Sequence, residues 1–149
     1  ITSAIFRLAV SFWVGGVALF TSVLTPTLFK TLPRDLAARV VGILFPGYFW
    51  WGLAAGTVAV ICLLFLRGRY FLPTLALLLL MLGLTSYQAF CLEPRADALK
   101  QQIVSFETAA EGDLLRREFS RVHGISMACN LAVLVSGIVV IILPGRARL

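Results

Sequence analysis

Four long apolar runs constrain this chain more than any other feature of its sequence. A helix needs roughly 20 residues to cross the hydrocarbon core of a bilayer, and each run comes close to that length. Barrel strands alternate in polarity and need only about 10 residues, so the runs predict helices. We expect one transmembrane domain over residues 1–149, an all-α integral membrane four-helix bundle whose spans cover residues 8–28, 46–66, 70–92 and 122–143.

Two polar stretches separate these runs. In residues 33–45, apolar side chains recur at helical spacing beside Arg34 and Arg39, which predicts a short amphipathic helix along the membrane interface before the second span. Pro46 would then be the first residue of that span, where its missing N–H costs nothing. Residues 93–121 carry six acids and five bases. They predict an extramembrane helical hairpin between the third and fourth spans.

The formal charge of +6 is spread over basic residues at the ends of the spans. That distribution favours anchoring to lipid headgroups over binding to nucleic acid. We therefore expect the lipid bilayer and other transmembrane helices as partners, and no nucleic acid. The sequence begins at Ile1, which fits removal of a targeting segment. Such removal favours an organellar inner membrane, mitochondrial or plastid, with an endomembrane or the plasma membrane as alternatives.

Small residues at a spacing of four occur in two of the runs. Ser11 and Gly15 form one such pair, and Gly52 and Gly56 form a G-x-x-x-G motif. This spacing lets helix backbones approach closely. We interpret both pairs as helix-packing features rather than ligand sites.

The fourth run contains the densest polar chemistry. His123, Met127 and Asn130 stand at i, i+4 and i+7, and Ser126 flanks them. Polar groups within a span are costly in hydrocarbon and should face the interior of the bundle. The simplest interpretation is that His123, Ser126 and Asn130 bond to neighbouring helices.

Two ligand-binding alternatives remain open at this stretch. His123 and Met127, with Cys129 or Cys91, could bind a soft metal such as copper, because thioether and thiolate groups suit Cu(I). Alternatively, His123 could ligate a haem iron or the magnesium of a chlorophyll. A haem held by two histidines is excluded within one chain, since His123 is the single histidine.

Catalytic patterns are weak by comparison. Ser126 lies three residues from His123, but no acid stands within the fourth run to orient the imidazole. We therefore expect no enzyme and no catalytic residues.

Four short motifs resemble the transmembrane protein 205 family in order and spacing. They are Leu-Pro-Arg at 32–34, Leu-Phe-Pro-Gly-Tyr-Phe at 44–49, Leu-Glu-Pro-Arg at 92–95, and Phe-Ser-Arg-Val-His-Gly-Ile-Ser at 119–126 followed by Cys-Asn-Leu at 129–131. That family comprises small four-span membrane proteins of unsettled biochemical activity, and its eukaryotic member has been linked to resistance against platinum drugs. The resemblance implies signature positions at Pro46, Tyr48, Pro94, His123, Gly124, Ser126 and Asn130.

Three functions follow from these observations. The first is a non-enzymatic membrane accessory protein that packs helices as a subunit of a larger complex, respiratory or photosynthetic. The second is a tolerance factor for soft metals or drugs that binds or moves copper-like or platinum-like cations through His123 and Met127. The third is a haem-binding or chlorophyll-binding subunit that uses His123.

Overall fold

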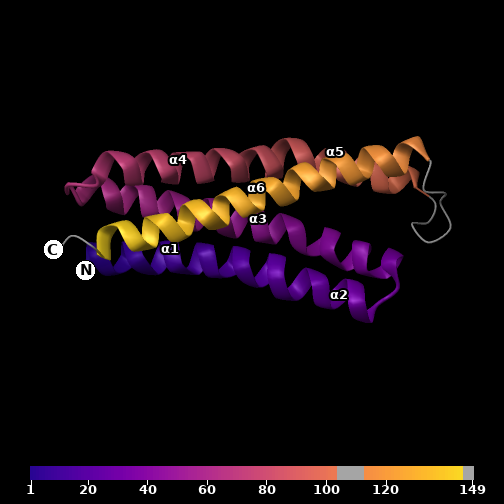
Figure 1. The fold of residues 1–149 in the computed structure, drawn as a ribbon, viewed down its shortest axis with the longest axis horizontal. Helices are drawn as coiled ribbons and strands as arrows, with labels where there is room; N and C mark the ends of the chain where they lie inside the picture. The colour runs from indigo at the N-terminus through magenta and orange to yellow at the C-terminus, as the bar shows by residue number, and fades with distance from the viewer. Residues whose placement is uncertain (104–112, 146–149) are drawn as a thin grey trace.

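The computed structural model describes residues 1–103 and 113–145, and within them it places four long helices side by side (Figure 1). Two of the four contain a π-helical turn, and two are uninterrupted. In chain order the elements are α1 (Thr2–Leu19), η1 (Phe20–Leu24), α2 (Thr25–Thr31), α3 (Arg34–Phe65), α4 (Phe71–Tyr87), η2 (Gln88–Leu92), α5 (Glu93–Gln102) and α6 (Leu114–Gly145).

The helices form an antiparallel up-and-down bundle. Helix α1 packs on α3, α3 on α4, α4 on α6, and α6 closes the ring against α1. The N-terminus, the α3–α4 turn and the end of α6 therefore lie at one end of the molecule (Figure 1). The α2–α3 connection, the end of α5 and the start of α6 lie at the other.

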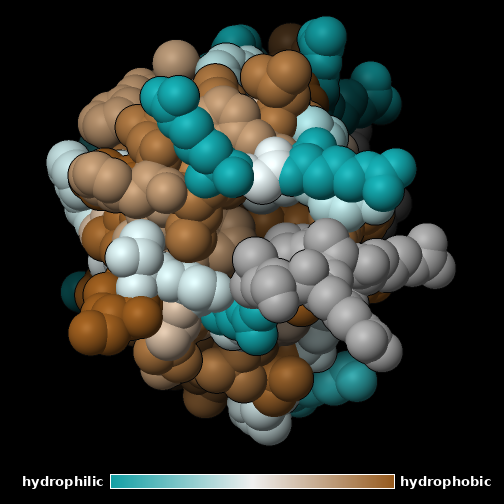
Figure 2. Space-filling view, turned by 90° about the vertical axis from the view of Figure 1, so that its left-hand side faces the viewer, coloured by the Kyte–Doolittle hydropathy of each residue, from teal (hydrophilic) through white to brown (hydrophobic). Residues whose placement is uncertain are grey.

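All four helices are long and apolar enough to cross a membrane. Each expected run coincides with part of one of them to within one residue. The outward faces carry large apolar side chains such as Phe12, Leu80 and Ile142. Figure 2 views the end that holds the N-terminus, and teal side chains project there from a largely brown surface. Arg7, and Arg69 of the α3–α4 turn, are exposed. The expected integral, multi-pass membrane bundle is thus supported by length, composition and surface.

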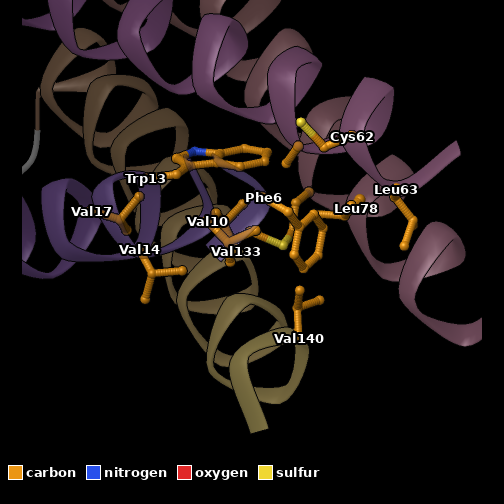
Figure 3. Close-up of a cluster of buried hydrophobic side chains, with 12 residues drawn as sticks. Phe6, Val10, Trp13, Val14, Val17, Cys62, Leu63, Leu78, Val133 and Val140 are labelled. Carbon is orange, nitrogen blue, oxygen red and sulfur yellow. The ribbon is translucent and has the colours of Figure 1, made fainter. Parts of the chain in front are cut away.

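The core lies between all four helices (Figure 3). Trp13 is its largest fully buried side chain, with an exposed fraction of 1%. The other buried members of this cluster are Phe6, Val10, Val14, Val17, Ala59, Cys62, Leu63, Leu78, Met81, Val133 and Val140. Because lipid tails are as apolar as these side chains, close packing rather than escape from water stabilises such a core.

Three glycines make this close packing possible. A Cβ on Gly56 would lie 2.5 Å from Cζ3 of Trp13 and 2.6 Å from Cδ2 of Leu82. A Cβ on Gly52 would lie 2.8 Å from Nε1 of Trp13, and one on Gly137 would lie 2.3 Å from Cγ2 of Val14. The packing role predicted for the G-x-x-x-G motif is confirmed.

The other pair of small residues, Ser11 and Gly15, behaves differently. Both are exposed on α1, and a Cβ on Gly15 would have no atom within 4 Å. This pair therefore makes no close helix contact within the described part of the chain.

The prediction of a separate short helix before the second span is wrong. Residues 34–65 form one helix, and Pro46 lies inside it rather than at its start. Buried side chains continue along one face on both sides of the proline, at Ala37, Val41, Phe49 and Gly52. A continuous packing face outweighs the single hydrogen bond that a proline removes from a helix.

Two helical arms lie where the hairpin is expected. Helix α5 continues α4 through η2, and α6 packs alongside it. Leu92, Ala96, Leu99 and Val122 form a second small core between these arms. The backbone N–H of Leu115 donates to Oδ1 of Asp113 at 3.1 Å, as expected for an N-cap. The reversal between the two arms of the expected hairpin falls outside the described residues.

The two halves of the chain have the same order of helical elements, which the sequence patterns did not reveal. Each half has a first helix with a five-residue π turn, η1 or η2, and a second helix of 32 residues, α3 or α6. A proline follows each π turn by two residues, at Pro26 and Pro94. A proline ring clashes with the carbonyl four residues before it. In both halves that carbonyl belongs to the π turn, whose wider backbone relieves the clash.

Candidate functional site

Two hydrogen bonds between helices form a polar layer inside the bundle. The Tyr48 hydroxyl of α3 donates to Oδ1 of Asn130 on α6 at 3.0 Å. The Ser126 hydroxyl of α6 donates to Oε1 of Gln88 at 2.8 Å. Gln88 is 1% exposed and Asn130 is 7% exposed. Since unpaired polar groups are expensive in hydrocarbon, these two pairs fix how α6 sits against α3 and η2.

Both π turns contribute to this layer. Gln88 is the first residue of η2, and Phe20, the first residue of η1, stacks on the Tyr48 ring at 4.5 Å between centroids. Phe45 and Phe49 extend the aromatic group around Tyr48. Tyr48 therefore faces inwards, whereas its neighbours Trp50 and Trp51 are exposed on the outer surface.

His123 lies two helical turns from Asn130, towards the α2–α3 end of the bundle. It is half-buried, and its ring stacks on Phe119 at 6.1 Å between centroids with 7° between the planes. It lines a cavity of about 210 Å³ between the two halves of the chain, which we name the Lys100 cavity. Its walls are Phe29, Arg34, Ala38, Val41, Phe45, Lys100, Arg116, Phe119, Ser120 and His123.

Lys100 and Glu93 form an ion pair beside this cavity. Nζ of Lys100 lies 3.9 Å from Oε1 of Glu93, and both side chains are 16% exposed. The ammonium nitrogen is itself buried and has no hydrogen-bond partner within the described part of the chain. It also lies against Gly42 of α3, where a Cβ would be 3.0 Å away. Sequence patterns did not single out Lys100, because its burial depends on α3 and α6, which are distant along the chain.

The residues predicted to bind a soft metal do not share one environment. Met127 is 51% exposed on the outer surface of α6, Cys129 is half-buried, and Cys91 is exposed. Among residues 1–103 and 113–145, no group of three or more His, Cys, Asp or Glu side chains is arranged to hold a metal ion. Copper binding by His123, Met127 and Cys129 stays a prediction.

His123 faces a cavity of about 210 Å³, which is smaller than the roughly 300–1,000 Å³ usual for small-molecule sites. Ligation of a haem or a chlorophyll by His123 stays a prediction.

A second feature of α6 is visible only in three dimensions. Gly124, Ala128 and Ala132 stand four residues apart, and all three face outwards. We name them the α6 stripe. Their spacing could have been noticed in the sequence, but nothing there distinguishes an outward stripe from an inward one such as Gly52 and Gly56.

Comparison with known proteins gives a family but no activity. A family model described as "Domain of unknown function (DUF4149)" matches residues 8–105. The chain belongs to this family. An "Uncharacterized protein" of Aquifex aeolicus (strain VF5) is similar to it, with 36% identity over 127 residues that cover 83% of this chain and 82% of the relative. No solved structure matches.

The DUF4149 match covers only part of the candidate site. It includes Tyr48, Gln88 and Lys100, and it ends before α6, which carries Ser126 and Asn130. The link to the transmembrane protein 205 family is not shown by these matches and stays a prediction.

Proposed function

We propose that this DUF4149 protein is a non-enzymatic membrane accessory protein that packs against transmembrane helices of a larger complex. The observation that supports this most is the outward position of the α6 stripe. Small residues at a spacing of four allow two helices to approach closely in lipid, where packing drives association. On a surface that contacts lipid alone, small side chains would have no such use.

The bundle itself does not use the α6 stripe. Its own close approaches use Gly52, Gly56 and Gly137, whose added Cβ atoms would collide with core side chains. In contrast, a Cβ on Gly124 would have no atom within 4 Å. Leu131 and Val135 border the stripe with exposed fractions of 60% and 53%. A partner helix could therefore rest on the small residues between larger side chains.

Exposed aromatic side chains support a particular placement in the membrane. Trp50 and Trp51 are exposed on α3, and tryptophan prefers the membrane–water interface. We infer that the α2–α3 end of the bundle, including α5 and the first turns of α6, projects beyond the hydrocarbon. The predicted extramembrane hairpin would then be these two packed helical arms. The hydrogen bond of Tyr48 to Asn130 places the α6 stripe near this level.

The α6 stripe can be tested by native gel electrophoresis of gently solubilised membranes. We expect the wild-type chain to migrate with a large complex, and the Ala128→Leu variant to migrate as the isolated chain. The matched control is Ala76→Leu, because Ala76 is exposed on α4 among large side chains. Wild-type protein that migrates alone, or Ala128→Leu that migrates as the wild type does, would contradict the proposal.

A further inference from the structure

We propose that the Lys100 cavity binds the phosphate of an anionic phospholipid headgroup. The charge of the residues that line the cavity itself favours an anion, while Asp35, Asp97 and Glu93 line neighbouring pockets that also contain Lys100. Among its ten lining residues, Arg34, Lys100 and Arg116 are cationic and none is acidic. Within the described chain, Glu93 is the acid paired with Lys100, and it stands at 3.9 Å, beyond hydrogen-bond distance.

The buried ammonium of Lys100 is the group that a phosphate would satisfy. Its Nζ atom is shielded from solvent and lacks a hydrogen-bond partner in the described residues. An ammonium buried without hydrogen bonds is unfavourable. A phosphate oxygen in the cavity would supply a charge-assisted hydrogen bond, which is stronger than a neutral one. Lysine is a common phosphate ligand of this kind.

The position of the cavity relative to the apolar runs favours lipid as the source of the phosphate. Of its lining residues, only His123 falls inside an expected apolar run, and the others lie within eight residues of the end of a run. That is the level at which phospholipid headgroups lie. Basic pockets between transmembrane helices are known to bind anionic headgroups.

The walls of the cavity fit the rest of such a lipid. Phe29, Phe45 and Phe119 supply aromatic surface beside the cations. A volume of about 210 Å³ suits a headgroup, while the acyl chains would remain in the surrounding bilayer. Free phosphate could use the cations but not this apolar surface, so we expect it to bind more weakly.

The test measures lipid retention and thermal stability of the full chain purified in neutral detergent. Phosphatidylglycerol, phosphatidylcholine or sodium phosphate is added, and bound lipid is counted by native mass spectrometry. We expect phosphatidylglycerol to be retained and to raise the melting temperature, and the other two to have little effect. Sodium phosphate that reproduces the full shift would overturn the assignment to a lipid.

Two variants locate the binding at Lys100. Lys100→Met should reduce phosphatidylglycerol affinity about tenfold, the scale of one charge-assisted hydrogen bond. Glu93→Gln should increase it, because the competing carboxylate is removed. The matched control is Lys30→Met, since Lys30 is exposed near the same end of the bundle. Retention that Lys100→Met leaves unchanged would overturn the proposal. If that variant does not fold, Glu93→Gln decides, and unchanged or weaker retention would overturn the proposal.

Discussion

Replacing Gly56 with alanine should lower the free energy of unfolding by about 1–3 kcal/mol, the usual cost of overpacking a core. The added Cβ would lie 2.5 Å from Trp13 and 2.6 Å from Leu82. Trp13 is fully buried, and its indole is rigid. The substitution should therefore push α3 away from α1, whereas the end of the Leu82 side chain on α4 is flexible and can shift.

The same substitution at Gly83 provides the control. Gly83 is exposed on α4, and its Cβ would have no atom within 4 Å. Alanine is the better helix former, so Gly83→Ala should leave stability unchanged or raise it by up to about 1 kcal/mol. Both variants can be compared by unfolding in mixed detergent micelles followed by circular dichroism. Equal stability of the two would contradict the close approach at Gly56.

Replacing Trp13 with alanine should have the largest effect of any single change in the core. Its side chain is 1% exposed and packs against Gly52 and Gly56. Both glycines leave room for the indole because they have no side chain of their own. When the indole is removed, we expect the surrounding helices to fill only part of the space. In soluble proteins a buried Trp→Ala change costs about 3–5 kcal/mol. Part of that cost is packing, which a membrane protein also loses.

Trp50→Ala is the matched control for this variant. Trp50 is 64% exposed and makes an edge-to-face contact with Phe90 at 6.1 Å. Such a contact contributes about 0.5–1.5 kcal/mol. The melting temperature in detergent, monitored by size-exclusion chromatography, should therefore fall much further for Trp13→Ala. A similar loss in both variants would show that the indole of Trp13 is not central to the core.

The membrane setting explains why the helices could be predicted well. A chain in lipid must satisfy its backbone hydrogen bonds within each span, so a long apolar run allows one structure only. The four runs therefore gave four helices. The motif of Gly52 and Gly56 likewise predicted packing, because close backbone approach needs that spacing whatever the partner.

Local signals failed where distant packing decides the structure. Pro46 is typical of a helix start, yet the buried face that includes Val41 and Phe49 carries α3 through it. The π turns at Phe20–Leu24 and Gln88–Leu92 each precede a proline, Pro26 or Pro94, whereas Pro46 lies within α3 without a π turn. A proline in the sequence therefore does not by itself predict a π turn.

The candidate sites depend even more on the fold. Tyr48 and Asn130 are 82 residues apart in the chain, and their hydrogen bond exists because α3 and α6 carry them to one level of the bundle. Gln88 belongs to no recognisable sequence motif, although its side chain is among the most deeply buried polar side chains described. From their spacing of i, i+4 and i+7, His123, Met127 and Asn130 were expected to lie on one face of the helix. In the bundle, however, Met127 faces outwards and Asn130 inwards.

The most direct test of the membrane-spanning bundle is cysteine labelling in sealed vesicles with a maleimide that cannot cross the bilayer. Cys62, Cys91 and Cys129 are first replaced with alanine, and Ser3→Cys, Gly68→Cys and Asp113→Cys are then introduced singly. Four crossings place residues 3 and 68 on one side and residue 113 on the other. We therefore expect the first two variants to be labelled from the same side, and Asp113→Cys to be labelled only from the opposite side. Labelling of Gly68→Cys and Asp113→Cys from one side would contradict the bundle.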